Sequence, residues 1–360
     1  MAANLAGRRM TLDPTLATLG WDENHDTTFP TPEPGVEPAR ALEVKRGFVR
    51  VRAASGEWLA PIPPSLRRGS KTYPQPGPPA TGDWLAVESG AGPVRGILPR
   101  SSVLRRYDEV AGEELLIANA DRAFVVTSLN QELNLSRLER LLAIADEGGV
   151  PALLALSKSD VAENPAGERD RVAAALGVEA IAFSSRTGAG LDALRERLEP
   201  RSTSVLLGSS GVGKSTLINT LLGEERQRTL EIRSADDQGR HATTTRTLVA
   251  LPCGGLLVDT PGLRSPRPSS ADGLRTTFAD VFGFAAQCRF ADCTHNAEPG
   301  CAVLEAIADG ELAERRLSSL RKLEREVEGA EARPEPTGAS GRSVRARAAD
   351  RAYQRGDDDD

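Results

Sequence analysis

The spacing of apolar residues divides the chain into three parts with different textures. Residues 44–106 contain short runs in which apolar residues alternate with basic or polar ones, separated by turns rich in glycine and proline. This pattern is typical of half-buried strands. Residues 121–222 alternate between apolar runs of strand length and segments with helical spacing, which predicts a mainly parallel sheet covered on both faces. After residue 263, cysteines are followed by segments with helical spacing.

The same spacing predicts individual elements. We expect strands at residues 47–52, 58–60, 83–87, 96–98, 123–127, 151–156, 180–183, 204–207 and 255–258. We expect helices at residues 135–145, 169–176, 191–198, 215–222, 303–307 and 312–327.

The textures predict a multidomain protein with five segments. Residues 1–42 are rich in proline, threonine and acidic residues and are expected to form a disordered extension. A small β-barrel over residues 43–112, an α/β domain over residues 113–265 and a helical domain with cysteines over residues 266–328 follow. Residues 329–360 are mostly alanine, arginine, glycine, proline and acidic residues, and we expect a disordered tail.

Composition narrows the class of protein. Hydrophobic residues make up 39% of the 360 residues, enough for a sizeable core, while 34 glycines and 24 prolines indicate many loops. The N-terminus has no apolar run long enough for a signal peptide, and no stretch approaches a membrane span. Four cysteines do not indicate a secreted disulfide scaffold. We therefore expect a soluble, cytoplasmic protein without a membrane partner.

A phosphate-binding loop lies between a predicted strand and a predicted helix. It fits the pattern Gly-x4-Gly-Lys-Ser and consists of Gly208, Ser209, Ser210, Gly211, Val212, Gly213, Lys214, Ser215 and Thr216. The glycines let backbone N–H groups turn toward phosphates, Lys214 would reach the β and γ oxygens, and the Ser215 hydroxyl would bind Mg²⁺. The alternative is a chance glycine-rich turn, against which the flanking strand and helix argue.

Two later motifs suit the γ-phosphate and its magnesium ion. Asp259, at the end of a predicted strand, would hold the Mg²⁺ shell, and the N–H of Gly262 would meet the γ-phosphate. Between the phosphate loop and Asp259 lie Thr243, Thr244 and Thr245. Any of these can supply the hydroxyl that a nucleotide-sensing switch needs, and they can also begin the strand that follows.

A base-reading motif precedes the phosphate loop. It consists of Ser157, Lys158, Ser159 and Asp160 at the end of one predicted strand, with Ser184 and Ser185 after the next strand. The Asp160 carboxylate can accept hydrogen bonds from both guanine N–H groups, and the Lys158 stem can lie beneath the ring. The serine pair can offer a backbone contact to the guanine carbonyl, so guanine is favoured over adenine. Because the base motif usually follows the phosphate loop, the reversed order predicts a circularly permuted P-loop GTPase domain.

A separate cluster combines three thiols with one imidazole. Its members are Cys288, Cys293, His295 and Cys301, in the pattern Cys-x4-Cys-x-His-x5-Cys. These ligand types at this spacing predict a closed tetrahedral site for one structural Zn²⁺, with no open position for catalysis. The alternative is a set of unpaired core cysteines, and the histidine inside the cluster argues against it.

Charge is unevenly distributed along the chain. The net charge is −6, yet residues 44–106 carry eleven basic and only three acidic residues. The basic residues are Lys45, Arg46, Arg50, Arg52, Arg67, Arg68, Lys71, Arg95, Arg100, Arg105 and Arg106. A basic β-barrel favours a nucleic-acid surface, RNA in particular, and a solvated basic face is the alternative.

The permuted motif order and the cysteine spacing together resemble the circularly permuted ribosome small-subunit-dependent GTPase A (RsgA) family of bacteria. The resemblance covers roughly residues 44–327 and includes Gly-Asp-Trp at 82–84, Ile-Ala-Asn-Ala-Asp at 117–121 and Gly-Arg-His at 239–241. It implies an OB-fold barrel, a permuted GTPase domain and a helical zinc-binding domain. It further implies a protein that uses GTP or GDP with Mg²⁺ and couples GTP hydrolysis to late maturation of the 30S subunit. We expect it to act as a monomer, although no motif in the sequence reports the oligomeric state. The implied partners are that subunit, its rRNA and other assembly factors.

The residue after the Asp-x-x-Gly motif lacks a polar group that could position the attacking water. Leu263 stands after Asp-x-x-Gly, where many GTPases carry the glutamine that orients water, so we expect slow intrinsic hydrolysis. The residues expected to act in catalysis are His241, Lys214 and Thr244, with Arg240 or Arg246 as alternative charge stabilisers.

Two positions depart from the family pattern. Ser157 stands where the family usually has asparagine or threonine, and Ala242 separates His241 from the threonines. Two other functions remain as alternatives: an ATP-dependent, kinase-like enzyme on the same loop, and a passive RNA-binding module whose nucleotide site only changes conformation.

Overall fold

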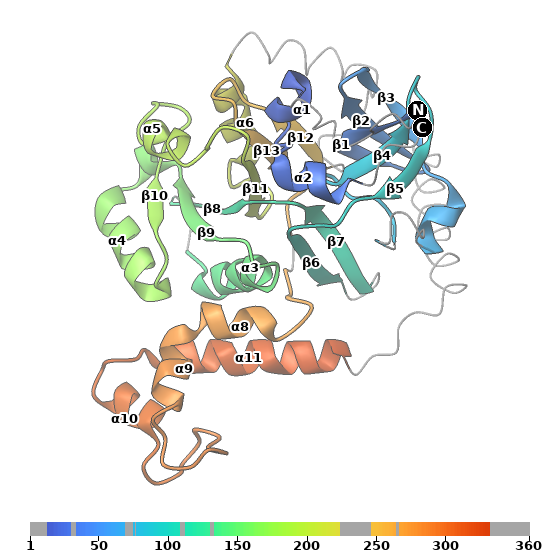
Figure 1. The fold of residues 1–360 in the computed structure, drawn as a ribbon. Coiled ribbons are helices and arrows are strands. Elements are labelled where there is room, and N and C mark those ends of the chain that lie inside the picture. Colours follow the sequence, from blue (N-terminus) through green and yellow to red (C-terminus); the bar gives the residue numbers. More distant parts are fainter. Residues whose placement is uncertain are drawn as a thin grey trace, which may run out of the picture.

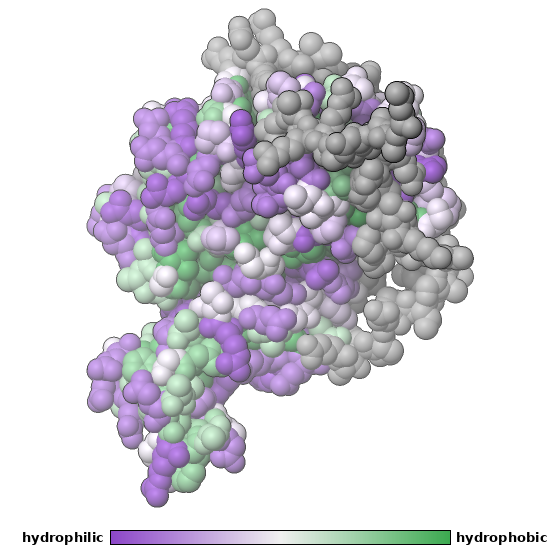
Figure 2. Space-filling model, viewed as in Figure 1, coloured by the Kyte–Doolittle hydropathy of each residue, from purple (hydrophilic) through white to green (hydrophobic). Residues whose placement is uncertain are grey.

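The structure is a computed structural model that describes residues 13–29, 34–68, 75, 77–108, 112–129, 133–223, 246–263 and 266–331. Within these ranges a β-rich N-terminal part, a central α/β part and a C-terminal group of helices follow one another (Figure 1). The C-terminal group projects from the body of the molecule (Figure 2). The predicted switch residues lie outside the described residues; they are Arg240, His241, Thr243, Thr244 and Thr245.

The strands form one large sheet and one separate hairpin. Their bounds are β1 (Val36–Lys45), β2 (Phe48–Ala53), β3 (Gly56–Pro61), β4 (Trp84–Glu88), β5 (Val94–Ile97), β6 (Val103–Asp108), β7 (Gly112–Ala118), β8 (Arg122–Ser128), β9 (Ala152–Ser157), β10 (Ala180–Ala182), β11 (Thr203–Gly208), β12 (Thr247–Ala250) and β13 (Leu256–Asp259). The large sheet runs in the order β10-β9-β8-β11-β13-β12-β1-β2-β3, with β4 paired to β1 and β5. β6 and β7 pair with each other.

The helices connect these strands and form the C-terminal group. Their bounds are α1 (Pro14–Thr18), α2 (Glu23–Thr28), η1 (Pro64–Arg68), α3 (Leu135–Glu147), η2 (Ser159–Val161), α4 (Pro165–Leu176), α5 (Leu191–Arg195), α6 (Lys214–Leu222), α8 (Asp272–Thr277), α9 (Ala279–Ala285), α10 (Ala302–Ala308) and α11 (Glu314–Glu331). Each predicted strand and helix has a counterpart among these elements. The pattern missed α1, α2, β1, α8, α9 and the β6–β7 hairpin. No helix in the described part of the chain is long and apolar enough to span a bilayer.

β11 lies in the middle of the central sheet and pairs in parallel with both β8 and β13. All of its residues are buried, as expected for a strand covered on both faces. β9 and β10 continue the parallel arrangement on one side, whereas β12 is antiparallel to β13 on the other. The parallel strands therefore end at one edge of the sheet, and the loops that follow them lie side by side.

Helices cover both faces of this sheet because its strands are apolar on both. On one face, α3 and α4 pack through Leu142 and Val172 in the same core as Val125. On the other face, α5 and α6 pack through Leu194 and Leu217 in the same core as Phe124. Phe124 and Val125 are neighbours in β8, so the two cores follow from the alternation of side chains along a strand.

The N-terminal strands enclose a second core of small and branched residues, among them Ala39, Val51 and Leu85. β1 pairs with β2 on one side and with β4 on the other. The Trp58 indole donates a hydrogen bond to the Gly92 carbonyl (3.1 Å), which brings β3 to the β4–β5 turn. This connectivity is that of a five-stranded OB barrel, as the sequence predicted. β1 also pairs with β12, so the barrel and the central sheet are continuous.

The prediction that residues 1–42 form a disordered extension is wrong for the residues that the structure describes there. α1 and α2 are regular helices, and β1 begins at Val36, so the predicted barrel boundary at residue 43 falls inside a strand. Asp13 and Asp22 cap the two helices by accepting backbone N–H groups, a local signal that the composition of the segment concealed.

Burial of a tryptophan explains why this segment is ordered. Trp21 is 2% exposed and lies edge-on to Trp84 of the barrel, with ring centroids 4.8 Å apart. Leu16 and Leu19 belong to the same core. Gly20 lies so close to the central domain that a Cβ there would come within 2.7 Å of the Arg201 carbonyl oxygen. Burying large apolar side chains offsets the conformational entropy lost on ordering the segment.

The C-terminal helices have their own apolar core and dock on α3. Leu274, Phe278 and Leu320 are among the buried residues of that core. α8 lies so close to α3 that a Cβ at Gly273 would come within 2.1 Å of the Ala143 carbonyl oxygen. Figure 1 shows α8 and α11 stacked on the side of α3 that faces away from the central sheet. α3 therefore makes most of the contact between the central domain and the C-terminal group, and Arg315 of α11 adds a hydrogen bond to the Ala175 carbonyl of α4.

Candidate nucleotide site and metal centre

The predicted phosphate loop follows β11 at the edge where the parallel strands end. Gly211 and Gly213 have φ angles of 79° and 99°, which favour glycine. At Gly208 the packing requires glycine as well, since a Cβ would come within 2.4 Å of the Val126 carbonyl oxygen. The outer residues of the loop and the first turn of α6 are exposed to solvent, namely Ser210, Gly211, Ser215 and Thr216.

Lys214 lies inside this loop and braces it. Its Nζ donates to the carbonyl oxygens of Gly208 (3.0 Å) and Ser209 (2.8 Å), and the residue is 6% exposed. Burial lowers the pKa of Lys214, while the nearby Asp259 carboxylate acts in the opposite direction. A lysine in this position can supply positive charge to phosphate oxygens with little reorganisation.

The Asp259–Gly262 loop packs directly against the phosphate loop. A Cβ at Gly262 would come within 2.5 Å of the Ser210 nitrogen, so glycine is required there. The Leu263 N–H donates to the Gly208 carbonyl (3.0 Å), which ties the two loops together. The Leu263 side chain is buried in the core between α3 and the sheet, so it presents no polar group to the site.

Asp259 has the environment of a metal ligand. Burial raises its pKa, while Lys214 and a hydrogen bond with Ser215 act to lower it. Its Oδ1 is buried and has no hydrogen-bond partner among the described residues. A buried carboxylate oxygen without a partner, beside a serine hydroxyl, fits the oxygen ligands that Mg²⁺ prefers.

The predicted base motif lies at the ends of β9 and β10, next to the phosphate loop. Ser157 is 3% exposed, and its hydroxyl donates to the Val212 carbonyl (2.5 Å). Ser157 therefore joins the two motifs instead of facing a base. The Ser159 N–H donates to the Phe183 carbonyl (3.0 Å), and Lys158 has a positive φ of 59°. This contact network sets the turn that carries Asp160.

Asp160 is held by the turn after β10. Arg186 donates to one oxygen of the Asp160 carboxylate through Nε (2.8 Å) and Nη2 (2.7 Å). Hydrogen bonds with Ser184 and with Arg186 lower the pKa of Asp160. The buried Ser184 hydroxyl also accepts from the N–H groups of Arg186 and Thr187, and Ser185 lies half-buried in the same turn. The carboxylate that the sequence selected for guanine thus lies in a preformed turn.

Two arginines near the site differ from what the sequence indicated. Arg246, considered as a charge stabiliser, donates to Glu114 of β7 (2.7 Å). Arg137, which no motif singled out, reaches the loop from the first turn of α3 and donates to the Ser209 hydroxyl (3.1 Å). Nothing in the local sequence around Arg137 could have indicated this contact, because it depends on how α3 lies beside β11.

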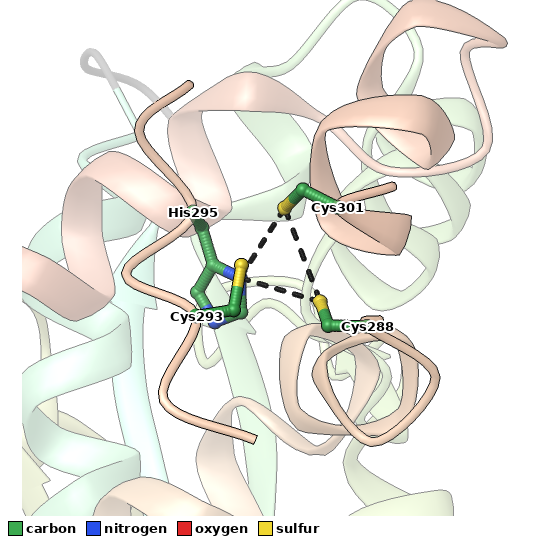
Figure 3. A group of neighbouring side chains, drawn as sticks. All are labelled: Cys288, Cys293, His295 and Cys301. Carbon is green, nitrogen blue, oxygen red and sulfur yellow. Dashed lines mark hydrogen bonds between the residues drawn. The ribbon is translucent and has the colours of Figure 1, made fainter. Parts of the chain in front are cut away.

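The four predicted zinc ligands converge on one centre (Figure 3). Cys288 Sγ lies 3.6 Å from His295 Nδ1 and 3.9 Å from Cys301 Sγ, and His295 Nδ1 lies 3.4 Å from Cys301 Sγ. All four ligand atoms, including that of Cys293, lie within 4.8 Å of one another. Ligands at Zn–S and Zn–N distances of about 2.3 and 2.0 Å around a tetrahedral ion would be about 3.5–3.8 Å apart. The donor set and its spacing therefore fit Zn²⁺.

The chain holds this cluster between the end of α9 and the start of α10. Burial of the Cys288 thiol acts to raise its pKa, but hydrogen bonds from the N–H groups of Val303 and Ala302 and with the Cys293 and Cys301 thiols together lower the pKa below its ordinary value. Arg321 of α11 donates to the carbonyls of Thr294 and His295 (3.0 and 2.8 Å). The long C-terminal helix thereby supports the loop that carries the ligands.

The basic residues of the barrel are largely paired with carboxylates. Arg50 lies 3.2 Å from Glu43 and 3.1 Å from Glu57, and the nearly buried Arg100 lies 2.7 Å from Asp83. Further pairs involve Lys45, Arg52, Arg105 and Arg106. Several partners, such as Glu43, lie outside residues 44–106, so a count along that stretch overstates its free positive charge.

The fold and these loops define a circularly permuted P-loop GTPase. A family model described as RsgA GTPase matches residues 97–268. The protein named "Small ribosomal subunit biogenesis GTPase RsgA" from Streptomyces coelicolor is 43% identical over 325 residues, 86% of each chain. The protein of that name from Syntrophotalea carbinolica is 39% identical over 328 residues, 87% of this chain and 89% of that one. The chain therefore belongs to the RsgA GTPase family.

Solved structures support the same fold. YjeQ from Thermotoga maritima is 24% identical and matches with a TM-score of 0.59 over 82% of this chain and 99% of that chain. YloQ, described as a circularly permuted GTPase, is 24% identical and matches with a TM-score of 0.57 over 83% of this chain and 97% of that chain. At this level of identity the likeness concerns the arrangement of elements and not the chemistry of individual residues.

Proposed function

We propose that this chain hydrolyses GTP and couples hydrolysis to late maturation of the small ribosomal subunit. The observation that carries the proposal is the convergence of three loops at one sheet edge: the phosphate loop, the Asp259–Gly262 loop and the turn that holds Asp160. The relatives named above carry small-subunit biogenesis in their names, and they match this chain over most of its length.

The nucleotide would be held by residues that the structure gathers at this edge. The phosphate loop and Lys214 would bind the β- and γ-phosphates, and the Gly262 N–H would meet the γ-phosphate. Asp160 would accept from the guanine N–H groups, with Lys158 beneath the ring. Ser215 and Asp259 would hold Mg²⁺, which would neutralise charge on the transferred phosphoryl group.

Hydrolysis requires a group that positions water, and the buried Leu263 does not supply one. We assign this role to His241, with Thr244 completing the magnesium shell; both lie outside the described residues. His241→Ala should abolish subunit-stimulated turnover and leave nucleotide binding intact. Arg171→Ala, on the exposed face of α4, is the matched control. Stimulated turnover that survives in His241→Ala would remove this residue from the mechanism.

The Cys288, Cys293, His295 and Cys301 cluster would hold one structural Zn²⁺. All four ligands come from the protein, so the ion would have no open position for a substrate. Its contribution would be to fold the loop between α9 and α10, which otherwise has few apolar residues to bury. The proposed partners are the 30S subunit, its rRNA and other assembly factors, with this chain acting as a cytoplasmic monomer.

Nucleotide competition and subunit stimulation test the proposal together. A fluorescent GDP analogue should be displaced by GTP and GDP and not by ATP, because Asp160 accepts from two guanine donors that adenine lacks. Turnover should rise several-fold when 30S subunits are added. Displacement by ATP would favour a kinase-like enzyme, and GTP binding without stimulated turnover would favour a passive RNA-binding module.

A further inference from the structure

The first turn of α3 touches both the phosphate loop and the C-terminal domain. Arg137 donates to the Ser209 hydroxyl of the phosphate loop (3.1 Å). The preceding residue, Ser136, lies within hydrogen-bond distance of Ser319 in α11 (3.2 Å). Two adjacent residues of one helix therefore contact the nucleotide site on one side and the C-terminal helix on the other.

A buried ion network fixes the next turn of α3 to α11. Glu139 is fully buried, and its Oε1 accepts from Arg315 (2.8 Å) and from Arg316 (2.8 Å). Arg316 also donates to Asp280 and lies over the ring of Phe278, with Cζ 4.5 Å from the ring centroid. Since α11 is attached through directional charged contacts, a rotation or shift of α3 has to be accompanied by α11 or has to break these bonds.

Arg137 is placed to respond to a bound polyphosphate. It is exposed, and its hydrogen-bond partner in the described part of the chain is the neutral hydroxyl of Ser209. A guanidinium can donate five hydrogen bonds. Phosphate oxygens at the adjacent loop would offer an anionic partner, and charge-assisted hydrogen bonds are about twice as strong as neutral ones. Such a differential contact is what a ligand needs in order to shift a conformational equilibrium.

We propose that Arg137 is a positioning residue that couples the phosphate loop to the C-terminal domain through the first turn of α3. The inference rests on the proposed binding of guanine nucleotide. It assigns the coupling to α3, which packs on both regions, and not to the chain segment between Asp259 and the cysteines. Because coupling between two sites is reciprocal, a change at α11 that shifts the equilibrium to which nucleotide is coupled must also alter nucleotide affinity.

Hydrogen exchange in the full-length chain tests one direction. With saturating GDP or a non-hydrolysable GTP analogue, exchange in residues 314–322 should slow several-fold in the wild type. Arg137→Ala should remove most of that nucleotide-dependent change, and Arg137→Lys, which keeps the charge, should retain at least half of it. Arg171→Ala, an exposed arginine of α4 paired only with its own helix in the described structure, should behave as wild type. A purely structural role for Arg137 would change exchange equally with and without nucleotide.

A double-mutant cycle tests the other direction. Arg315→Ala removes the α11 contacts to Glu139 of α3 and to the Ala175 carbonyl of α4, neither of which belongs to the phosphate loop, and should change nucleotide affinity by about threefold to tenfold. In the Arg137→Ala background the same substitution should have no further effect. Additive effects of the two substitutions would overturn the coupling. Failure of the wild type to bind guanine nucleotide would instead overturn the proposed function, so the two failures are distinguishable.

Discussion

The N-terminal and C-terminal domains are joined to the central sheet in different ways. At the N-terminal joint the apolar core is continuous: Trp21, Leu42 and Trp84 share one cluster with Val205 and Leu256 of the central sheet. The sheet is continuous as well, because β1 pairs with β12. The barrel and the GTPase domain are therefore parts of one packed body.

At the C-terminal joint, polar side chains make most of the specific contacts. Glu139 accepts from two arginines of α11, and Arg140 lies 2.5 Å from Glu326. Near the other end of α3, Asp146 accepts from a threonine of α8 and Glu147 from a serine just before it. The described apolar cluster of the C-terminal domain takes one residue, Ala143, from α3.

The difference matters because apolar and polar contacts respond differently to salt and to the loss or exchange of a partner. Apolar burial is non-directional and nearly independent of salt, so it fixes the barrel in place. Hydrogen bonds and ion pairs are directional, are weakened when a partner is lost, and can be exchanged for others. A joint of the second kind, attached to a helix that also touches the phosphate loop, suits a domain that responds to nucleotide.

Removing zinc should cause the largest loss of stability, and the loss should be confined to the C-terminal domain. Structural Zn²⁺ sites contribute on the order of 10 kcal/mol to folding, so a strong chelator should release one zinc per chain and unfold the loop between α9 and α10. Hydrogen exchange should rise sharply in residues 288–308 and stay unchanged in residues 48–61. Release of no zinc, or an equal rise in both regions, would contradict the assignment of the cluster.

Trp21→Ala should weaken the N-terminal joint. Truncating a fully buried tryptophan costs about 3–5 kcal/mol, because its contacts are lost and a cavity remains. Urea unfolding followed by circular dichroism would measure the loss. Leu59→Ala, at a position that is 52% exposed, is the matched control and should change stability by about 0.5 kcal/mol or less. A loss as small for Trp21 as for Leu59 would show that the N-terminal helices do not hold the barrel.

Arg316→Met should weaken the C-terminal joint by a smaller amount. The substitution leaves the buried Glu139 with one arginine, and removing one partner of a buried pair costs about 3 kcal/mol. Limited proteolysis should cut the C-terminal helices faster, while the barrel stays resistant. Adding Glu139→Gln should recover part of the loss, because the uncompensated charge is then gone. Arg325→Met, on the exposed side of α11, serves as the control.

Arg140→Ala should cause the smallest loss of stability. The dependence of that loss on salt should distinguish the polar C-terminal joint from the apolar N-terminal one. The pair with Glu326 is only partly buried, so we expect a loss of about 1 kcal/mol at low salt. The loss should shrink in 1 M salt, where the screening length falls to about 3 Å. The effect of Trp21→Ala should not depend on salt. Equal salt dependence of the two losses would remove the distinction between the joints.

Much of the nucleotide site could be predicted from the sequence because its demands are local. A phosphate loop needs glycines at fixed positions, and Gly208 and Gly213 meet steric and conformational requirements that other residues would violate. The zinc ligands could be predicted from the sequence equally well, because Cys288 and Cys301 lie within one short loop and its flanking turns. The same local logic failed for residues 13–29, where Trp21 is held by a barrel residue distant in the sequence.

The sequence by itself determined the chemistry available: which loops can cradle phosphate, which carboxylate can read a base, and which side chains can bind a metal. Tertiary structure alone decided which charges meet. It paired Arg50 and Arg246 with carboxylates from other strands, and it brought Arg137 to Ser209. The physical reason is the separation along the chain over which each effect acts. Backbone conformation depends on neighbours in the chain, whereas burial and ion pairing depend on how the sheet and α3 bring distant segments together.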